Sequence, residues 1–377
     1  MTTETQIDWA RVRSYFPVTD KCAYLNTAAA GPLPRATMEA GSGYYQQMMA
    51  DGDIHWDEWL AKRENVRKKV AALINAEPDE IGLTTNTSSG MNLIVDALES
   101  RGEVISCDLE FPVSTITWMH RQIPVHQVRS VAGVVDPSDI RSAMTPKTGV
   151  ISLSHVQYSN GFRSDLGQLG LEKGSHALVV NASQSAGVFD IDVKRMKIDA
   201  LCATGHKWML SGYGSGFVYL SRALLSETKS RAIGWLSVED PYGGRNAEIN
   251  LRSDASARAE LGCPDFAGIF ALGASVELFS EIGMANIQHR ALAINRLLTD
   301  RLVEAGFKVL SPLADENNRS AETLVAFENP TRVVTQLAEQ KVIVTEKPQG
   351  IRVATDFFNN DEDIEQLIQA LKNGSRL

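Results

Sequence analysis

Four short apolar runs restrict the fold of this chain more than any other feature. They cover residues 103–107, 149–154, 177–181 and 216–220, and apolar side chains follow one another in them without regular alternation. Successive side chains of a strand point to opposite faces of a sheet, so a continuous apolar run is typical of a strand that is buried on both faces. The sequence therefore predicts an α/β fold with a mostly parallel sheet and helices on each side.

Segments with apolar residues at helical spacing lie before, between and after these runs. The predicted helices cover residues 56–74, a segment beginning at Met91, residues 266–279, residues 284–305 and the chain after Asn360. Open parallel sheets bind ligands at the carboxyl ends of their strands. Ser88, Asn181 and Lys207 are all expected at or near such ends, so a ligand site is predicted there.

Composition and charge argue against several classes of protein. The chain has 377 residues and a formal net charge of −9, and no run of lysine and arginine is long enough to follow a nucleic-acid backbone. No apolar stretch approaches the roughly 18 residues of a membrane span, and the N-terminus lacks the pattern of a signal peptide. The four cysteines are scattered, with neither metal-ligand nor disulfide spacing. We therefore expect a cytoplasmic protein without a metal site, a nucleic-acid partner or a membrane association.

Lys207 is the most informative single residue. It follows the apolar run that begins after Asp199, has Trp208 beside it and precedes a glycine-rich turn. Most lysines are exposed on loops, but this position favours burial, which lowers the pKa of an amine and makes it nucleophilic. Such an amine can form an imine with an aldehyde, and Thr204 and His206 could bind a phosphate beside it.

The residues around Lys207 carry a resemblance to a known family. A run ending at Asn181 continues to Gln184 and Gly187, and Asp192-Val193 and then Gly205-His206-Lys207-Trp208 follow. This order resembles the class V aminotransferase family of fold-type I enzymes that depend on pyridoxal 5'-phosphate (PLP), which includes cysteine desulfurases and isopenicillin N epimerases. Residues 234–241 resemble a further segment of the epimerases.

The resemblance implies a three-layer PLP-dependent transferase fold with a smaller α+β domain at the C-terminal end. The implied large PLP-binding domain covers residues 21–265, and the small domain covers residues 266–377. Residues 1–20 are expected to pack near the active site or the small domain.

The same resemblance assigns the cofactor contacts. Lys207 would carry PLP as a Schiff base, and its phosphate would bind the turn with Ser88 and Ser89, together with Thr204 and His206. From the residues alone, Ser88 or Thr87 could instead simply cap a helix. Phe111 would stack on the ring, although burial in the core is the usual place of a phenylalanine. The ring oxygen would be approached by Gln157, or alternatively Asn160, and from the other side by Gln184.

Asn181 departs from the family pattern. The family has an aspartate here, whose charge keeps the pyridine nitrogen protonated, and a neutral amide favours that form much less. Three readings stay open: chemistry that needs a weaker electron sink, an engineered change that traps an intermediate, or lost catalysis with retained binding.

A second departure lies in residues 260–265. Cys263 stands where the family has a threonine that reaches the phosphate of the neighbouring subunit, and a thiol is a weaker donor than a hydroxyl. The surrounding Glu260-Leu-Gly frame and Pro264 are retained, so the resemblance implies a homodimer with shared active sites.

The substrate side is implied by both ends of the chain. Arg352, in a segment that resembles the closing motif of the family, would bind the substrate α-carboxylate through its planar fork. From the residues alone it could be a surface arginine on an edge strand. Asn26 and Ala28, in the opening segment, are further candidates for substrate contacts.

Together these residues predict a PLP-dependent enzyme acting on an α-amino acid, either a transferase or a lyase. An epimerase and a catalytically attenuated PLP-binding protein are the alternatives. No cysteine follows Cys263, which disfavours a desulfurase that passes sulfur through a persulfide in its small domain.

Overall fold

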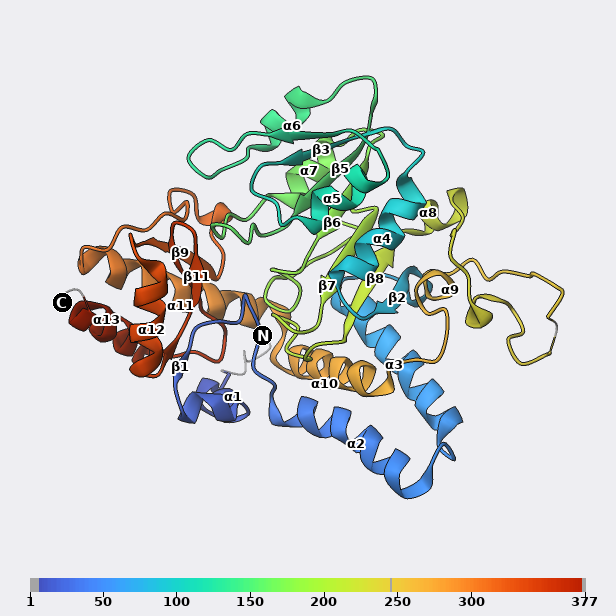
Figure 1. Ribbon diagram of the computed structural model, residues 1–377, viewed down its shortest axis with the longest axis horizontal. Coiled ribbons are helices and arrows are strands. Elements are labelled where there is room, and N and C mark those ends of the chain that lie inside the picture. Colours follow the sequence, from blue (N-terminus) through green and yellow to red (C-terminus); the bar gives the residue numbers. More distant parts are fainter. Residues whose placement is uncertain (1–6, 245, 375–377) are drawn as a thin grey trace, which may run out of the picture.

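A seven-stranded sheet forms the centre of the computed structural model, which describes residues 7–244 and 246–374 (Figure 1). The strand order is β2-β8-β7-β6-β5-β3-β4, and β8 runs in the direction opposite to that of the other six strands of this sheet. The strands are β2 (Ile81–Thr84), β3 (Glu103–Cys107), β4 (Val125–Val128), β5 (Thr148–Ser154), β6 (Ala177–Asn181), β7 (Ala200–Thr204) and β8 (Gly216–Leu220). The predicted mostly parallel sheet is confirmed.

Helices cover both faces of this sheet, which gives three layers. The helices of this region are α2 (Arg35–Asp51), α3 (Trp56–Leu73), α4 (Thr87–Leu98), α5 (Val113–His120), α6 (Pro137–Ala143), α7 (Leu166–Glu172), α8 (Arg222–Glu227), α9 (Ala255–Ala259) and α10 (Phe266–Ile282). Strand β6 shows why both faces are covered. Leu178 and Val180 pack in a cluster with residues of α3, α7 and α10, and Ala177 and Val179 pack in another with residues of α4 and α5.

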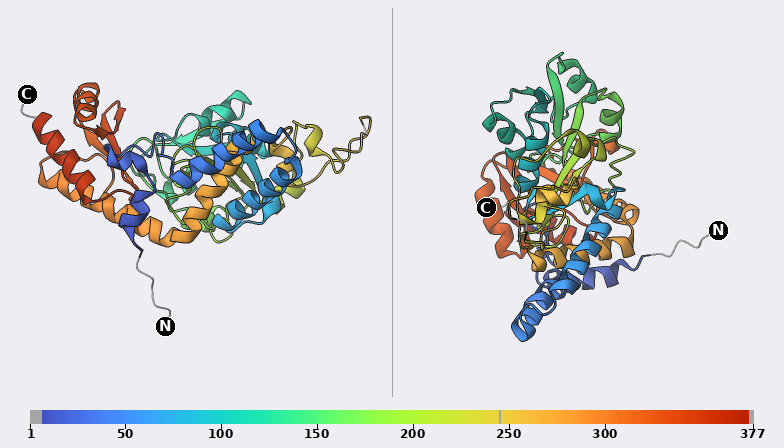
Figure 2. Two further views of the ribbon diagram at one scale, coloured as in Figure 1. Left: turned by 90° about the horizontal axis from the view of Figure 1, so that it is seen from below. Right: turned by 90° about the vertical axis from the view of Figure 1, so that its right-hand side faces the viewer.

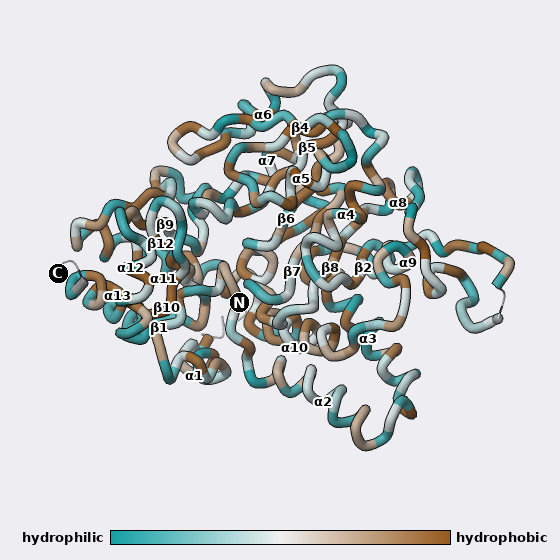
Figure 3. The backbone as a smooth tube through the Cα atoms, viewed as in Figure 1, coloured by the Kyte–Doolittle hydropathy of each residue, from teal (hydrophilic) through white to brown (hydrophobic). Residues whose placement is uncertain are grey.

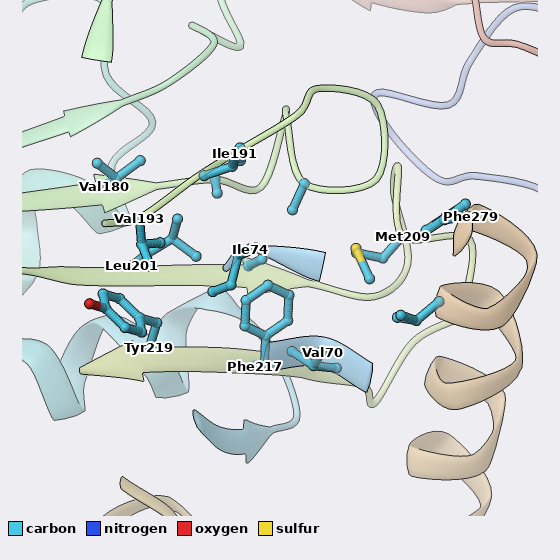
Figure 4. Packing of buried hydrophobic residues seen from close by; sticks show 14 of the residues in the cluster. Val70, Ile74, Val180, Ile191, Val193, Leu201, Met209, Phe217, Tyr219 and Phe279 are labelled. Carbon is cyan, nitrogen blue, oxygen red and sulfur yellow. The ribbon is translucent and has the colours of Figure 1, made fainter. Parts of the chain in front are cut away.

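Figure 4 shows the first of these clusters, where Val70 and Ile74 from the end of α3 face Phe217 and Tyr219 of β8. The tube in Figure 3 is strongly hydrophobic along α10, which packs against α2 and α3. Burial of apolar surface at about 25 cal/mol per Å² is the main force that holds these layers together.

Two smaller sheets and three helices form the second cluster of elements, at the left of Figure 1. One sheet has the order β11-β12-β9, and the other pairs β1 with β10. The elements are β1 (Ala23–Tyr24), β9 (Glu322–Ala326), β10 (Val342–Ile343), β11 (Thr345–Lys347), β12 (Gly350–Ala354), α11 (Met284–Glu304), α12 (Pro330–Glu339) and α13 (Asp361–Gly374). Their apolar side chains share one core.

The N-terminal part of the described chain joins this region. After α1 (Trp9–Ser14), strand β1 pairs in parallel with β10, and Arg13 forms an ion pair with Asp363 of α13 at 2.7 Å. The predicted domain boundaries at residues 20 and 265 stay predictions, and residues 1–6 of the first segment lie outside the described residues.

Two further features are the position of the chain between α8 and α9 and the length of the apolar helices. The chain between α8 and α9 extends away from the sheet, as Figure 2 shows in its left-hand view. Among residues 7–244 and 246–374, no single helix is long and apolar enough to cross a membrane, and α10 and α11 pass that test only as a pair bent by 84°.

Candidate active site

A cavity of about 350 Å³ opens where the carboxyl ends of the parallel strands meet the small three-stranded sheet. Its lining comes from the last residues of β5, β6 and β7, from the segments that follow β1, β2, β3, β5, β6 and β7, including the first residues of α4 and α5, and from β11 and β12. The lining residues are Ala28, Ala29, Asn86, Thr87, Ser88, Phe111, Val113, Ser154, Val156, Tyr158, Asn181, Ser183, Gln184, Thr204, His206, Lys207, Lys347 and Arg352. A cavity of this size is sufficient for a small cofactor with its substrate.

Lys207 stands three residues after the end of β7, and the backbone around it is tightly held. The amide of Gly31 donates to the carbonyl of His206 at 2.7 Å, and a Cβ at Gly31 would lie 2.2 Å from the carbonyl oxygen of Lys207. Burial, with a smaller contribution from the positive charge of Arg352, lowers the pKa of the Lys207 amine to about 8. Near neutral pH, the neutral and nucleophilic form of this amine is therefore more populated than in an ordinary exposed lysine.

One end of the cavity has the features of an anion site. Helix α4 begins there, and the side chain of its N-cap, Asn86, accepts from the amide of Ser89 at 3.0 Å. Ser88 and Thr204 line this end, and the Thr204 hydroxyl lies 2.8 Å from Nδ1 of His206. Burial and then the charge of Lys207 lower the pKa of His206 to about 4, so its ring is neutral and serves as a hydrogen-bonding group. Hydroxyls at a helix N-terminus favour a phosphate.

Helix α4 begins at Thr87, four residues before the predicted start at Met91. Its N-cap is Asn86 rather than Ser88 or Thr87. This leaves the Ser88 hydroxyl free of the capping bond. Ser89 points elsewhere: it contacts the hydroxyl of Thr85 at 3.1 Å and lines a neighbouring cavity that also contains Cys263.

The middle of the cavity has an aromatic wall and a buried amide. Phe111 is half-exposed to the cavity, and Tyr158 packs against it edge to face at 5.0 Å between ring centroids. Asn181, at the end of β6, accepts from the amide and hydroxyl of Ser183 and donates from Nδ2 to the hydroxyl of Ser114 at 3.0 Å. Gln184 is fixed between Trp208 and the carbonyl of Ala28, at 2.7 and 3.0 Å.

Several predicted contacts lie outside this lining. Gln157 is buried and donates to Glu110 at 2.7 Å, and Asn160 donates to the carbonyl of Gly133 at 2.8 Å. The Asn26 side chain accepts from the hydroxyl of Thr345. The assigned roles of these residues, and of Ser89 and Cys263, are not tested by their positions and stay predictions.

Arg352 closes the other end. It lies on β12, donates to the carbonyl of Tyr158 at 3.2 Å, and stands 3.3 Å from the carboxylate of Glu322 on β9. Both side chains are almost completely buried, at 5% and 1% exposure. Burial raises the pKa of Glu322, and the nearby charges of Arg352, Lys207 and Lys347 oppose that rise.

Sequence reasoning missed three residues of this end: Glu322, Tyr158 and Lys347. Lys347 lines the cavity from β11, and its ammonium lies 4.3 Å from the centroid of the Tyr158 ring. Its strand has only three residues and no apolar pattern, so no local signal marked it. The clue available in the sequence was that Lys347 lies five residues before Arg352. In the structure, residues 345–347 pair with the strand that contains Arg352.

The family match covers most of the chain. Residues 23–367 match the family described as aminotransferase class-V. The chain belongs to this family. It is an enzyme of the PLP-dependent aminotransferase fold, and the resemblance read from residues 181–208 is confirmed.

Two named relatives span nearly the same length as this chain. The chain is 26% identical to the uncharacterized aminotransferase YcbU of Bacillus subtilis (strain 168), covering 95% of this chain and 96% of that protein. It is 27% identical to the isopenicillin N epimerase of Streptomyces clavuligerus, covering 97% and 98%.

Solved structures agree on the fold. The apo cysteine desulfurase of Thermococcus onnurineus NA1 superposes with a TM-score of 0.89 at 22% identity, covering 99% of each chain. A mutant of C-DES with glycine covalently linked to its PLP cofactor gives a TM-score of 0.87 at 21% identity, covering 95% of this chain and 98% of that chain. The predicted three-layer PLP-transferase fold is therefore confirmed.

Proposed function

We propose that this class V enzyme uses PLP at Lys207 to transform an α-amino acid, as a transferase or a lyase. The position of Lys207 carries this proposal: a lysine with a lowered pKa lies between an anion site and a buried arginine. The residues fit the cofactor, since the N-terminus of α4 with Ser88 suits its phosphate and Phe111 offers a ring face beside the lysine, 5.8 Å from Nζ.

Each group then has a definable task. When bound, PLP withdraws electrons from the α-carbon of the substrate, which makes its proton removable. The Arg352 fork binds the α-carboxylate and orients the substrate. The Lys207 amine removes and returns the proton at the α-carbon as general base and acid. The Phe111 ring, with Tyr158 packed against it at 5.0 Å, would offer an apolar face to the ring of the cofactor.

Epimerisation is the second candidate, and the similarity to isopenicillin N epimerase over nearly the whole chain favours it. In an epimerisation, the proton returns to the α-carbon on the face opposite to the one from which it was removed. An epimerase therefore needs a proton donor on that face in addition to the base. The catalytically attenuated PLP-binding protein rests on Asn181 alone, because the amide there is neutral.

A persulfide-forming desulfurase is the least favoured reading. Cys107 and Cys202 are buried, and burial raises the pKa of both thiols, so neither is a ready nucleophile. Cys263 is exposed and lines the neighbouring cavity with Ser89. Among the described residues that line the main cavity, none is a cysteine.

We also propose a cytoplasmic homodimer that takes a small amino-acid substrate. The dimer is supported by exposed apolar side chains on α2 and on the segment that extends between α8 and α9.

A labelling experiment tests the central assignment. Borohydride treatment of the PLP-loaded protein should attach the cofactor covalently to Lys207, and mass spectrometry of the peptides should locate it there. Lys207→Ala should lose turnover by about 100- to 10,000-fold, because a positioned acid–base group contributes that much. Lys147→Ala is the control, because Lys147 is 80% exposed far from the cavity. Labelling of a different lysine would contradict the proposal.

A panel of amino acids then separates the reactions. Transamination releases an oxo acid, β-elimination releases pyruvate and ammonia, and epimerisation alters only the configuration at the α-carbon. If no amino acid reacts while PLP still binds, the attenuated alternative is favoured.

A further inference from the structure

The substrate end of the cavity has an excess of positive charge. Lys207, Lys347 and Arg352 line the cavity, and none of the described lining residues is Asp or Glu. The nearest carboxylate that contacts one of them is Glu322, which stands behind Arg352. Burial raises the pKa of Glu322, which favours its neutral form. Once Lys207 is engaged with the cofactor, Arg352 and Lys347 remain, one cation more than the α-carboxylate of an ordinary amino acid balances.

Strand register places Lys347, Arg352 and Glu322 in one diagonal row. The three strands lie in the order β11-β12-β9, with Thr345 opposite Arg352 and Leu324 opposite Arg352 on the other side. Directly opposed residues share a face, and so do residues two apart along a strand. Lys347 and Glu322 therefore lie on the face of Arg352, on opposite flanks of it, each as a diagonal neighbour.

This row gives Arg352 two different neighbours. On the β9 side, the buried Glu322 does not line the cavity and offers no positive charge to a second anionic group of a bound substrate. On the β11 side, Lys347 would attract one. Diagonal neighbours lie about 7–8 Å apart at the backbone. The lysine and arginine side chains are flexible, so their charged ends can both reach one substrate whose two carboxylates are joined by a few carbon atoms.

The Lys347 ammonium is poised for such a group. Among the residues that the structure describes, it makes no hydrogen bond and no ion pair within 4 Å, and its ring contact is with Tyr158 at 4.3 Å. Tyr158 also accepts the hydrogen bond of Arg352 through its backbone carbonyl. Burial, followed by the repulsion of Arg352, lowers the pKa of Lys347 to about 8, so the amine stays largely protonated at neutral pH.

We infer that Lys347 is a specificity-determining residue that binds a side-chain carboxylate, and that the enzyme selects α-amino dicarboxylic acids. The inference rests on the proposed function for its chemistry. Arg352 takes the α-carboxylate, and Lys347 takes the distal carboxylate. An alternative is that Lys347 assists Arg352 at the α-carboxylate, which would give no selectivity for the side chain.

Isosteric pairs of substrates separate these possibilities. The PLP-loaded enzyme should favour L-glutamate over L-glutamine, or L-aspartate over L-asparagine, in kcat/KM. Lys347→Met should raise KM for the acidic member by about 10- to 100-fold, the value of a hydrogen bond to a charged group, and leave the amide member unchanged. Lys347→Arg should retain the preference, and Lys147→Met, an exposed control, should change neither value.

A binding measurement supplies a readout that does not depend on turnover. Titration calorimetry with glutarate and with butyrate should show that Lys347→Met weakens only the dicarboxylate, with circular dichroism as the check on folding. Equal loss for acidic and amide substrates, or no preference in the unaltered enzyme, would overturn the inference. If glutarate binding depends on Lys347 but no amino acid reacts, the proposed function fails and the anion site stands.

Discussion

At the scale of single residues, the environment of Asn181 is as informative as its identity. Its carbonyl oxygen accepts two hydrogen bonds from Ser183, and its Nδ2 donates to the hydroxyl of Ser114. A hydroxyl can donate as well as accept. In an aspartate, the oxygen that faces Ser183 would keep both of its hydrogen bonds, and the other oxygen would compete with the buried Glu110 for the single proton of the Ser114 hydroxyl.

We therefore expect Asn181→Asp to fold and to change the chemistry. A carboxylate next to the pyridine nitrogen should raise the pKa of that nitrogen by about 1–3 units, which strengthens the electron sink. Transamination should rise as a main or side reaction, measured as oxo-acid release, with a pH titration of the cofactor absorbance as the direct check.

Asn317→Asp is the control for an added negative charge, because Asn317 is exposed on the surface. If the native activity falls while transamination rises, the amide tunes the reaction. If every activity improves, Asn181 is an attenuating change. An unaltered spectrum and turnover would mean that Asn181 does not contact the ring nitrogen.

At the scale of elements, one carboxylate joins three segments that flank the site. Glu260, at the end of α9, forms an ion pair with Arg67 of α3 and accepts from the amide of Leu83 on β2 at 2.9 Å. Arg67 also donates to the carbonyl of Ile81 at 2.9 Å. Both ionic side chains are buried, at 5% and 7% exposure. This pair explains the retained glutamate of the Glu260-Leu-Gly frame by its structural role.

Glu260→Gln should lower the free energy of unfolding by about 3 kcal/mol, because it leaves a buried guanidinium without one of its two carboxylate partners. Urea unfolding followed by tryptophan fluorescence measures this loss. Glu277→Gln is the matched control, since the Lys69–Glu277 pair is partly exposed, at 29% and 58%, and should contribute less than about 1 kcal/mol. Equal losses for the two variants would show that burial does not govern this pair.

Elements with strong local patterns were predictable from the sequence, and elements formed by pairing were not. Strands β3, β6 and β8 have the predicted limits, because continuous apolar runs require burial on both faces. Lys207 and Arg352 were found through motifs. Lys347 was missed because β11 exists only through its pairing with β12. Gln157 was expected to contact the cofactor, but its amide donates to the buried Glu110, a contact that no local pattern indicates.

At the scale of the whole molecule, two groups of apolar side chains lie on the surface rather than in a core. Tyr45 and Met49 on α2 are exposed, Met49 at 84%. Tyr242 and Ile249 are exposed on the segment that extends between α8 and α9 (Figure 2). Large apolar side chains that gather on the surface are typical of an interface, and the predicted contact of Cys263 with a partner's phosphate requires an interface near this segment.

We expect the protein to be a homodimer whose interface includes these side chains. Tyr45→Asp combined with Met49→Asp should shift the protein toward monomer in sedimentation velocity, because two charges would have to be buried without partners. Leu171→Asp is the control, since Leu171 is 71% exposed on α7, away from both groups. The PLP affinity of the double variant should fall together with the dimer fraction if the partner contributes to the phosphate site. A monomer with full activity would contradict the shared site, and a dimer unaffected by the double substitution would place the interface elsewhere on the molecule.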